Sequence, residues 1–282
     1  MYKRQGYVPA VTPDVLPRLF VVGCPRSGTT LLQSFFAAHP AVHAFPETHF
    51  FYRLRARPGW RRRLGLTAPE VRPDLPAVAG FLGRPRTRWP RVPTVRRTVG
   101  TFVAAADAAT AAAGRRTWVE KTPANLYAID LVERFVPNAR FVHVVRDGAD
   151  VVASLCAVAE GWGSSYTVDT ALETWRECVA ITAAHRGRPG HAVLGYADLV
   201  EHPDRVLARV CDQAGLPFDP AMIEGRAAAA GALIKDFETW KGANTGPLLH
   251  RPRERFERQF DAATRRYVAE RVAEVGVPVS GV

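Results

Sequence analysis

The sequence predicts an α/β fold, a three-layer sandwich in which a central and mainly parallel sheet is flanked by helices. Short apolar runs of strand length alternate with longer segments of helical periodicity, an order typical of parallel strands joined by helices. The chain has 282 residues, of which 47% are hydrophobic, and this is enough for one full-sized core. We therefore expect a single domain over residues 1–282.

The first expected strand and helix enclose a glycine-containing turn. Residues 18–24 (RLFVVGC) form a short apolar run of the kind that a buried parallel strand requires. Apolar residues between 30 and 36 then recur at helical spacing, and the pattern stops at His39-Pro40 because the residue before a proline disfavours the helical conformation. Residues 42–45 predict a second short strand.

The later elements alternate as the fold class requires. Residues 53–100 are rich in Pro, Gly and Arg and predict an irregular insertion with short helices, and the Ala-rich segment 101–113 predicts a helix that ends at Gly114. The C-terminal third is mostly helical around a loop at 240–252. We expect strands at 117–121, 139–146 and 191–196, and helices at 124–135, 148–159, 167–185 and 203–214.

The formal net charge of +11 is concentrated in the insertion. Residues 53–97 hold thirteen arginines and no lysine against two carboxylates, Glu70 and Asp74, so the rest of the chain is close to neutral. A basic segment attracts anionic partners, and this one would suit an acidic peptide or an anionic glycan on the acceptor side. The alternative is a solvated, Pro-rich loop. No zinc-ligand spacing or RNP-like aromatic motif supports binding to nucleic acid.

The cysteines and the N-terminus indicate the compartment. No stretch approaches the roughly 18 consecutive apolar residues of a membrane span, and residues 1–10 lack the apolar segment of a secretory signal. The cysteines form no Cys-x-x-Cys pair, which argues against a disulfide framework or a zinc site. They are Cys24, Cys156, Cys178 and Cys211. We expect a cytoplasmic protein with reduced thiols.

The turn at residues 23–30 (GCPRSGTT) has the arrangement of a P-loop, in which backbone N–H groups and the positive end of a helix bind an anion. Its candidate ligands are Arg26, Ser27, Gly28, Thr29 and Thr30. A nucleotide-kinase loop carries lysine where this chain has Thr29, so binding of ATP with magnesium is disfavoured. Arg26 can instead point at a terminal anionic group. The alternative is a glycine turn that binds nothing.

A second candidate anion site follows the strand expected at 139–146. Arg146 ends this strand, and Asp147-Gly148 opens the next helix. Ser154 lies two helical turns further on, where its hydroxyl could share a phosphate with Arg146, because arginine grips phosphate bidentately. A cofactor with phosphate at two separate points would use both loops.

As an ordered set, these motifs resemble the family of sulfotransferases that use 3′-phosphoadenosine 5′-phosphosulfate (PAPS). The likeness is closest to the protein-tyrosine sulfotransferases and related bacterial enzymes, over about 18–50 and 117–214. The matching segments are PRSGTT at 25–30, Glu47, KTP at 121–123 and VRDG at 145–148. The resemblance implies that the first loop binds the 5′-phosphosulfate, that Arg146 and Ser154 bind the 3′-phosphate, and that sulfuryl transfer to a hydroxyl leaves 3′,5′-diphosphoadenosine (PAP).

The resemblance also implies three catalytic residues. Glu47 matches the general base of the family and follows an expected strand end, where sites gather in open α/β sheets. Arg26 and Lys121 would stabilise charge on the sulfuryl group and on the leaving phosphate, so no metal is implied. His49 and His43 are rival bases, because other branches of the family use histidine.

Two further contacts with the nucleotide are expected on the same ground. Tyr196, at the end of the strand expected at 191–196, resembles a family tyrosine near the nucleotide, although Gly195 replaces the arginine before it. Lys241 and Gly242 are candidates for covering the 3′-phosphate, as a C-terminal loop does in relatives, but their spacing departs from the KGxxG pattern.

Two other functions stay open at this point. A P-loop kinase would bind ATP with magnesium, and an inactive adaptor would keep the loops but lose Glu47 or Lys121, both of which are present. Among acceptors, a small natural product, a glycan and a peptidyl tyrosine are all compatible with the family.

Overall fold

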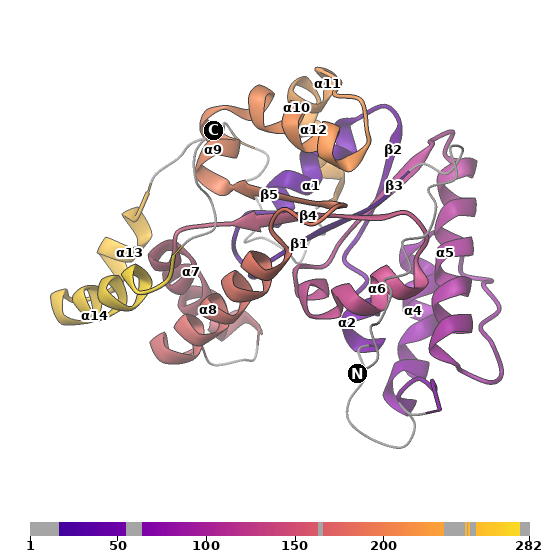
Figure 1. Ribbon diagram of the computed structural model, residues 1–282, viewed down its shortest axis with the longest axis horizontal. Coiled ribbons are helices and arrows are strands. Elements are labelled where there is room, and N and C mark those ends of the chain that lie inside the picture. Colours follow the sequence, from indigo (N-terminus) through magenta and orange to yellow (C-terminus); the bar gives the residue numbers. More distant parts are fainter. Residues whose placement is uncertain are drawn as a thin grey trace, which may run out of the picture.

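The computed structural model describes residues 17–54, 64–162, 166–233, 246, 248 and 252–276. Five parallel strands form one sheet in the order β2-β3-β1-β4-β5, with helices on both of its faces (Figure 1). The strands are β1 (Arg18–Gly23), β2 (Val42–Phe45), β3 (Thr117–Lys121), β4 (Ala139–Val145) and β5 (His191–Gly195). The predicted fold class is confirmed.

The helices divide into two layers. One layer is formed by α1 (Thr29–Ala38), α9 (Tyr196–Glu201), α10 (Pro203–Ala214), α11 (Ala221–Glu224) and α12 (Arg226–Leu233). The other contains α2 (Phe50–Leu54), α4 (Leu75–Phe81), α5 (Val95–Ala112), α6 (Ile129–Phe135), α7 (Gly148–Trp162), α8 (Val168–His185), α13 (Glu254–Gln259) and α14 (Ala262–Ala273), with the 3₁₀ helices η1 (Pro69–Asp74) and η2 (Pro123–Ala128).

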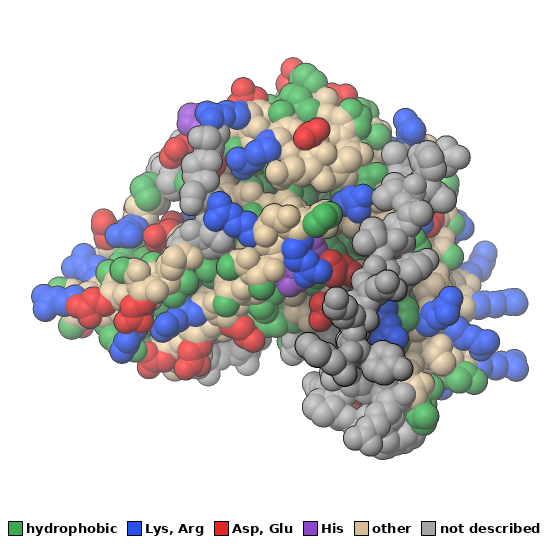
Figure 2. Space-filling model, in the orientation of Figure 1, with side chains coloured by type: hydrophobic (Ala, Val, Ile, Leu, Met, Phe, Trp, Pro, Cys, Tyr) green, Lys and Arg blue, Asp and Glu red, His purple; other side chains and the backbone are tan. Residues whose placement is uncertain are grey.

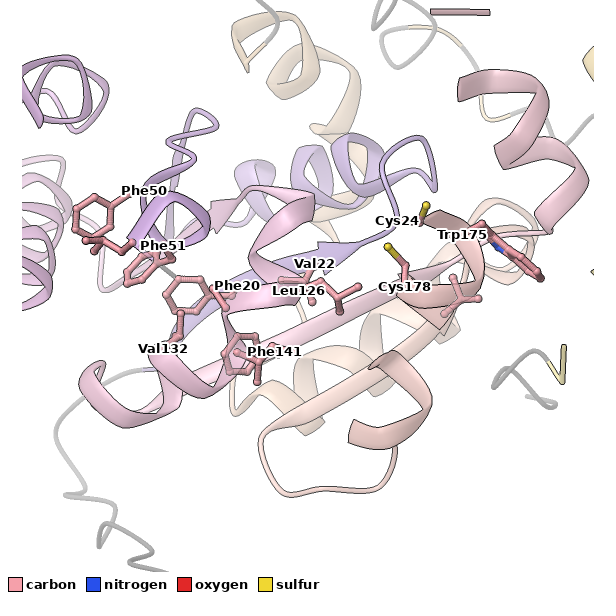
Figure 3. Packing of buried hydrophobic residues seen from close by; sticks show 14 of the residues in the cluster. Phe20, Val22, Cys24, Phe50, Phe51, Leu126, Val132, Phe141, Trp175 and Cys178 are labelled. Atoms are coloured by element: carbon pink, nitrogen blue, oxygen red, sulfur yellow. The ribbon is translucent and has the colours of Figure 1, made fainter. Parts of the chain in front are cut away.

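The central strand β1 is buried on both faces because its side chains alternate between two cores. Phe20 and Val22 belong to the core beneath α5, α7 and α8, whereas Leu19 and Val21 belong to the core beneath α1 and α10. Figure 3 shows Phe20 between Phe51 and Phe141, with ring centroids 5.2 and 5.5 Å away. Cys24, Cys178 and Trp175 lie at the other end of the same core (Figure 3).

Several expected boundaries differ from the structure. Helix α5 begins at Val95 rather than at 101, because the Thr94 side chain caps it by accepting a hydrogen bond from the Arg97 N–H. The helix expected at 124–135 is divided into η2 and α6. Tyr196 does not end β5; it is the first residue of α9, which the sequence interpretation missed because the apolar run gives no sign of a break.

The chain order creates a topological switch point, with a crevice at the carboxyl ends of β1 and β4 in the middle of the sheet. β1 and β4 are neighbours, yet the helices that follow them, α1 and α7, cover opposite faces. In open α/β sheets, ligands bind at the carboxyl ends of strands where successive connections diverge in this way. The two loops with candidate anion ligands therefore flank one crevice. Among the helices that the structure describes, none is both long and apolar enough to cross a membrane.

Candidate active site

The loop between β1 and α1 has the backbone geometry of an anion cradle. Arg26 and Gly28 both have positive φ, 72° and 96°, and Gly28 is the N-cap of α1. A Cβ on Gly28 would lie 2.3 Å from the Tyr196 ring, so only glycine fits here. The first-turn N–H groups of a helix have no intrahelical acceptor, and they are available to an anion at this end of α1. The buried hydroxyl of Ser27 has no hydrogen-bond partner among the described residues.

Arg26 connects the two candidate anion sites directly. Its Nε donates a hydrogen bond to the Ser154 Oγ at 2.9 Å. Burial lowers the pKa of Arg26 to about 10, the charges of Arg255 and Arg146 add to the decrease, and the charge of Glu47 opposes it. The guanidinium stays protonated at neutral pH, and the arginines concentrate positive charge at this end of the crevice.

Arg146 is oriented by two neighbours. Its guanidinium lies over the Tyr196 ring, 4.3 Å from the ring centroid, and forms a 3.2 Å ion pair with the buried Asp150. Asp150 also accepts a 2.8 Å hydrogen bond from the Arg253 N–H, which attaches the start of α13 to this site. The sequence interpretation paired Ser154 with Arg146; in the structure, the described partner of the Ser154 hydroxyl is Arg26.

Glu47 and Lys121 meet on the other side of the loop. The Lys121 Nζ contacts the Glu47 Oε1 and donates a 3.2 Å hydrogen bond to the Thr30 Oγ1. The Lys121 side chain is 1% exposed, whereas that of Glu47 is 22% exposed. A buried ammonium thus joins β3 to the first turn of α1 and to the segment that follows β2. The Glu47 carboxylate keeps access to a ligand.

A buried carboxylate that the sequence interpretation missed, Glu120, anchors this segment. Glu120 accepts hydrogen bonds from the Thr48 N–H and hydroxyl, from the Thr122 hydroxyl at 2.6 Å and from the Asn125 amide at 2.6 Å. Burial raises the pKa of Glu120, and the bonds from Thr122 and Thr48 counteract the increase. The contacts with Thr48 fix the residue next to Glu47. The sequence signal that could have identified Glu120 is its position next to Lys121 in the strand expected at 117–121.

The two rival bases occupy different places. The His49 Nε2 lies 3.6 Å from the Glu47 Oε2, so this histidine borders the candidate site. His43 lies in β2 with its ring against Phe45, and burial and the charge of Arg115 lower its pKa. Arg115 precedes β3, so His43 lies toward the amino ends of the strands, away from the crevice.

The remaining expected site residues are partly accounted for. Thr29 is buried at the first position of α1, and Tyr196 covers Gly28. Lys241 and Gly242 lie outside the described residues.

Arg253 and Arg255 were not expected from the sequence, because only the docking of α13 against α7 brings them to the crevice. In the described part of the chain, no three His, Cys, Asp or Glu side chains converge as a metal site would require.

The sequence of this chain is similar to that of known sulfotransferases. Residues 17–220 match the model of the sulfotransferase family. The chain is 31% identical over 229 residues to Nodulation protein NoeE of Sinorhizobium fredii, covering 72% of this chain and 51% of that protein. It is 24% identical over 235 residues to the Protein-tyrosine sulfotransferase of Drosophila melanogaster, covering 74% of this chain and 40% of that protein. The chain therefore spans about half the length, or less, of these relatives.

Among solved structures, the fold is similar to that of mouse sulfotransferase SULT7A1 complexed with PAP. The TM-score is 0.53 at 11% sequence identity, and the match covers 92% of this chain and 84% of that chain. At this identity the likeness concerns the fold.

Proposed function

Because the chain belongs to the sulfotransferase family, we propose that it transfers the sulfuryl group of PAPS to an acceptor hydroxyl and releases PAP. The observation that carries this proposal is the shared crevice at the ends of β1 and β4, where Arg26 is hydrogen-bonded to Ser154 and Arg146 lies over Tyr196. A donor with phosphate groups at two separate points needs two cationic contacts at the same end of the sheet. The mouse protein similar in fold was crystallised with PAP.

The residues present fit this donor. The N–H groups at the start of α1, with Ser27, Thr29 and Thr30, would hold the 5′-phosphosulfate. The Ser27 hydroxyl, which has no hydrogen-bond partner among the described residues, supports this placement. Arg146 and Ser154 would hold the 3′-phosphate. Tyr196, which lies against both Gly28 and Arg146, would contact the nucleotide. We also retain Lys241 and Gly242 as candidates for covering the 3′-phosphate.

We propose that Glu47 removes the proton from the acceptor hydroxyl as the oxygen attacks sulfur. Its carboxylate is the partly exposed member of the pair with Lys121, so an acceptor can reach it. Arg26 and Lys121 would stabilise the negative charge that develops on the leaving phosphate, as preorganised cations do in other transfer reactions. PAPS supplies the activated sulfuryl group, and the protein supplies alignment, charge stabilisation and the base.

The acceptor side is proposed to include part of the segment 53–100. Helix α2 starts three residues after Glu47, and its Phe50 ring stacks on Phe102 of α5 with centroids 4.4 Å apart. The region around α4 and α5 is thereby fixed close to the base. A small natural product, a glycan and a peptidyl tyrosine are the acceptor classes to compare. We propose cytoplasmic action, since the free thiols of all four cysteines suit a reducing compartment.

The proposal is tested with sulfur-labelled PAPS and a panel of phenols, sugars and tyrosine peptides. Label should move to at least one acceptor in the wild-type protein and not in the Glu47→Gln variant. Calorimetry should detect PAP binding without magnesium and no response to ATP. Absence of PAP binding, or magnesium-dependent binding of ATP, would refute the proposed donor and favour a kinase.

A further inference from the structure

A groove of about 1070 Å³ lies on the outer side of α5. One wall is formed by the loop at residues 83–90, which carries Arg84, Arg86 and Arg88, and Arg97 in the first turn of α5 extends the same surface. Figure 2 shows Lys and Arg side chains gathered on this side of the molecule, over α4 and α5. None of the lining residues belongs to the candidate active site.

The four arginines of the groove are exposed and carry charge that the described chain does not neutralise. No described carboxylate forms an ion pair with Arg84, Arg86, Arg88 or Arg97, and no Asp or Glu lines the groove. Arginine presents a planar fork of donors that matches a carboxylate bidentately. Four such groups along one concavity favour a ligand with several carboxylates.

The floor of the groove is lined by residues with small side chains. It is formed by Gly100, Thr101, Ala104, Ala105 and Ala108 on one side of α5. A Cβ added at Gly100 would meet nothing within 4 Å, so packing within the described chain does not require glycine there. Small residues leave room for the backbone and side chains of another polypeptide to approach the helix closely.

We propose that this groove docks an acidic polypeptide segment of a partner protein. No described aromatic residue lines the groove to stack nucleic-acid bases, and Trp89 instead packs against Phe50 with ring centroids 5.9 Å apart. The concave shape disfavours a flat lipid surface. The inference goes beyond sulfuryl transfer, because none of the described lining residues is among those proposed to bind PAPS or to act as the base.

The probe for the test is a fluorescein-labelled glutamate peptide of about ten residues, which spans up to about 33 Å at roughly 3.3 Å per residue. Fluorescence anisotropy with the full chain and no PAP should show binding that weakens with salt. The double variant Arg84→Glu/Arg97→Glu should weaken binding by about tenfold or more, since two attractive charges become repulsive. Gly100→Trp, whose Cβ would meet nothing within 4 Å, places a bulky ring on the floor and should weaken binding as well.

The matched control is Arg205→Glu/Arg266→Glu, which makes the same change in net charge on α10 and α14. It should leave peptide affinity within about twofold, and PAP affinity should be unchanged in every variant. The proposal is overturned if the peptide does not bind, if the control weakens binding equally, or if phosphatidylglycerol vesicles or single-stranded DNA bind this groove more tightly than the peptide. Absence of PAP binding in the wild-type protein would contradict only the proposed sulfuryl donor, not the docking of an acidic peptide.

Discussion

The Nε of Arg26, in the loop after β1, donates a hydrogen bond to the Oγ of Ser154 on α7 at 2.9 Å. This bond crosses the crevice between the two candidate phosphate sites and joins residues 128 positions apart in the chain. The Arg146 guanidinium is held separately by Asp150 and Tyr196, and its charge acts on Arg26. The two sites are therefore parts of one unit, and a change at Ser154 should affect both.

Ser154→Ala should weaken PAP binding by about 10- to 150-fold, because a hydrogen bond to a charged group contributes on the order of 1.5–3 kcal/mol. The variant removes a proposed phosphate donor and also releases Arg26 from its 2.9 Å contact. Isothermal titration calorimetry with PAP measures the change. Thr174→Ala, at a half-buried position on α8 far from the proposed phosphate contacts in the chain, is the control and should bind like the wild type. Unchanged affinity in Ser154→Ala would contradict the placement of the 3′-phosphate.

Glu47→Gln should lower kcat by about 10²–10⁴-fold, because a positioned general base contributes on that order. PAP affinity should stay within about twofold, since the amide keeps the shape of the side chain and the proposed role lies in proton transfer. Single-turnover transfer of labelled sulfuryl separates the two effects. Glu173→Gln on α8 is the control for loss of one carboxylate.

His49→Ala separates the two candidate bases. The His49 ring lies 3.6 Å from the Glu47 carboxylate. If Glu47 accepts the proton, removing this ring should lower kcat by less than about tenfold. A larger decrease in kcat in His49→Ala than in Glu47→Gln would identify His49 as the general base.

The fold could be predicted because its strands are short apolar runs buried on both faces, and such runs are visible in sequence. The Arg26 loop was also recognisable, since glycine at position 28 and a polar cluster after a strand have a local cause. Glu120, Asp150 and Arg255 were missed for a different reason. Their roles depend on contacts between segments far apart in the chain, and no local pattern records that Thr48 or the start of α13 will approach them.

Gly28→Ala should destabilise the protein by about 2 kcal/mol and abolish PAP binding at usable concentrations. Two causes combine here: φ is 96°, and the added Cβ would meet the Tyr196 ring at 2.3 Å. Adding Tyr196→Ala removes the collision but not the backbone strain, so it should recover only part of the loss in the free energy of unfolding. Urea unfolding measures both variants. Gly231→Ala on α12, where an added Cβ meets nothing within 4 Å, should be neutral or stabilising.

The buried histidine chain beside β4 predicts how stability depends on pH. His143 is within hydrogen-bond distance of His191 at 3.0 Å and of Thr182 at 3.3 Å, and His191 in turn lies 2.9 Å from Glu133. Burial lowers the pKa of His143 from 6.5 to about 3, and the charges of His191 and His185 add to the decrease. The unfolded chain therefore binds this proton more readily than the folded protein does.

The stabilisation from neutral His143 is complete above the unfolded pKa of 6.5 and is lost as the pH falls toward 3. By pH 4 the loss should amount to about 3 kcal/mol, to which titrating carboxylates add. His143→Gln cannot take up the proton, so its free energy of unfolding should fall less steeply than that of the wild type between about pH 6.5 and 4. His202→Gln, at an exposed histidine, should keep the wild-type slope. Equal slopes in the wild type and His143→Gln would show that His143 is not the group that titrates.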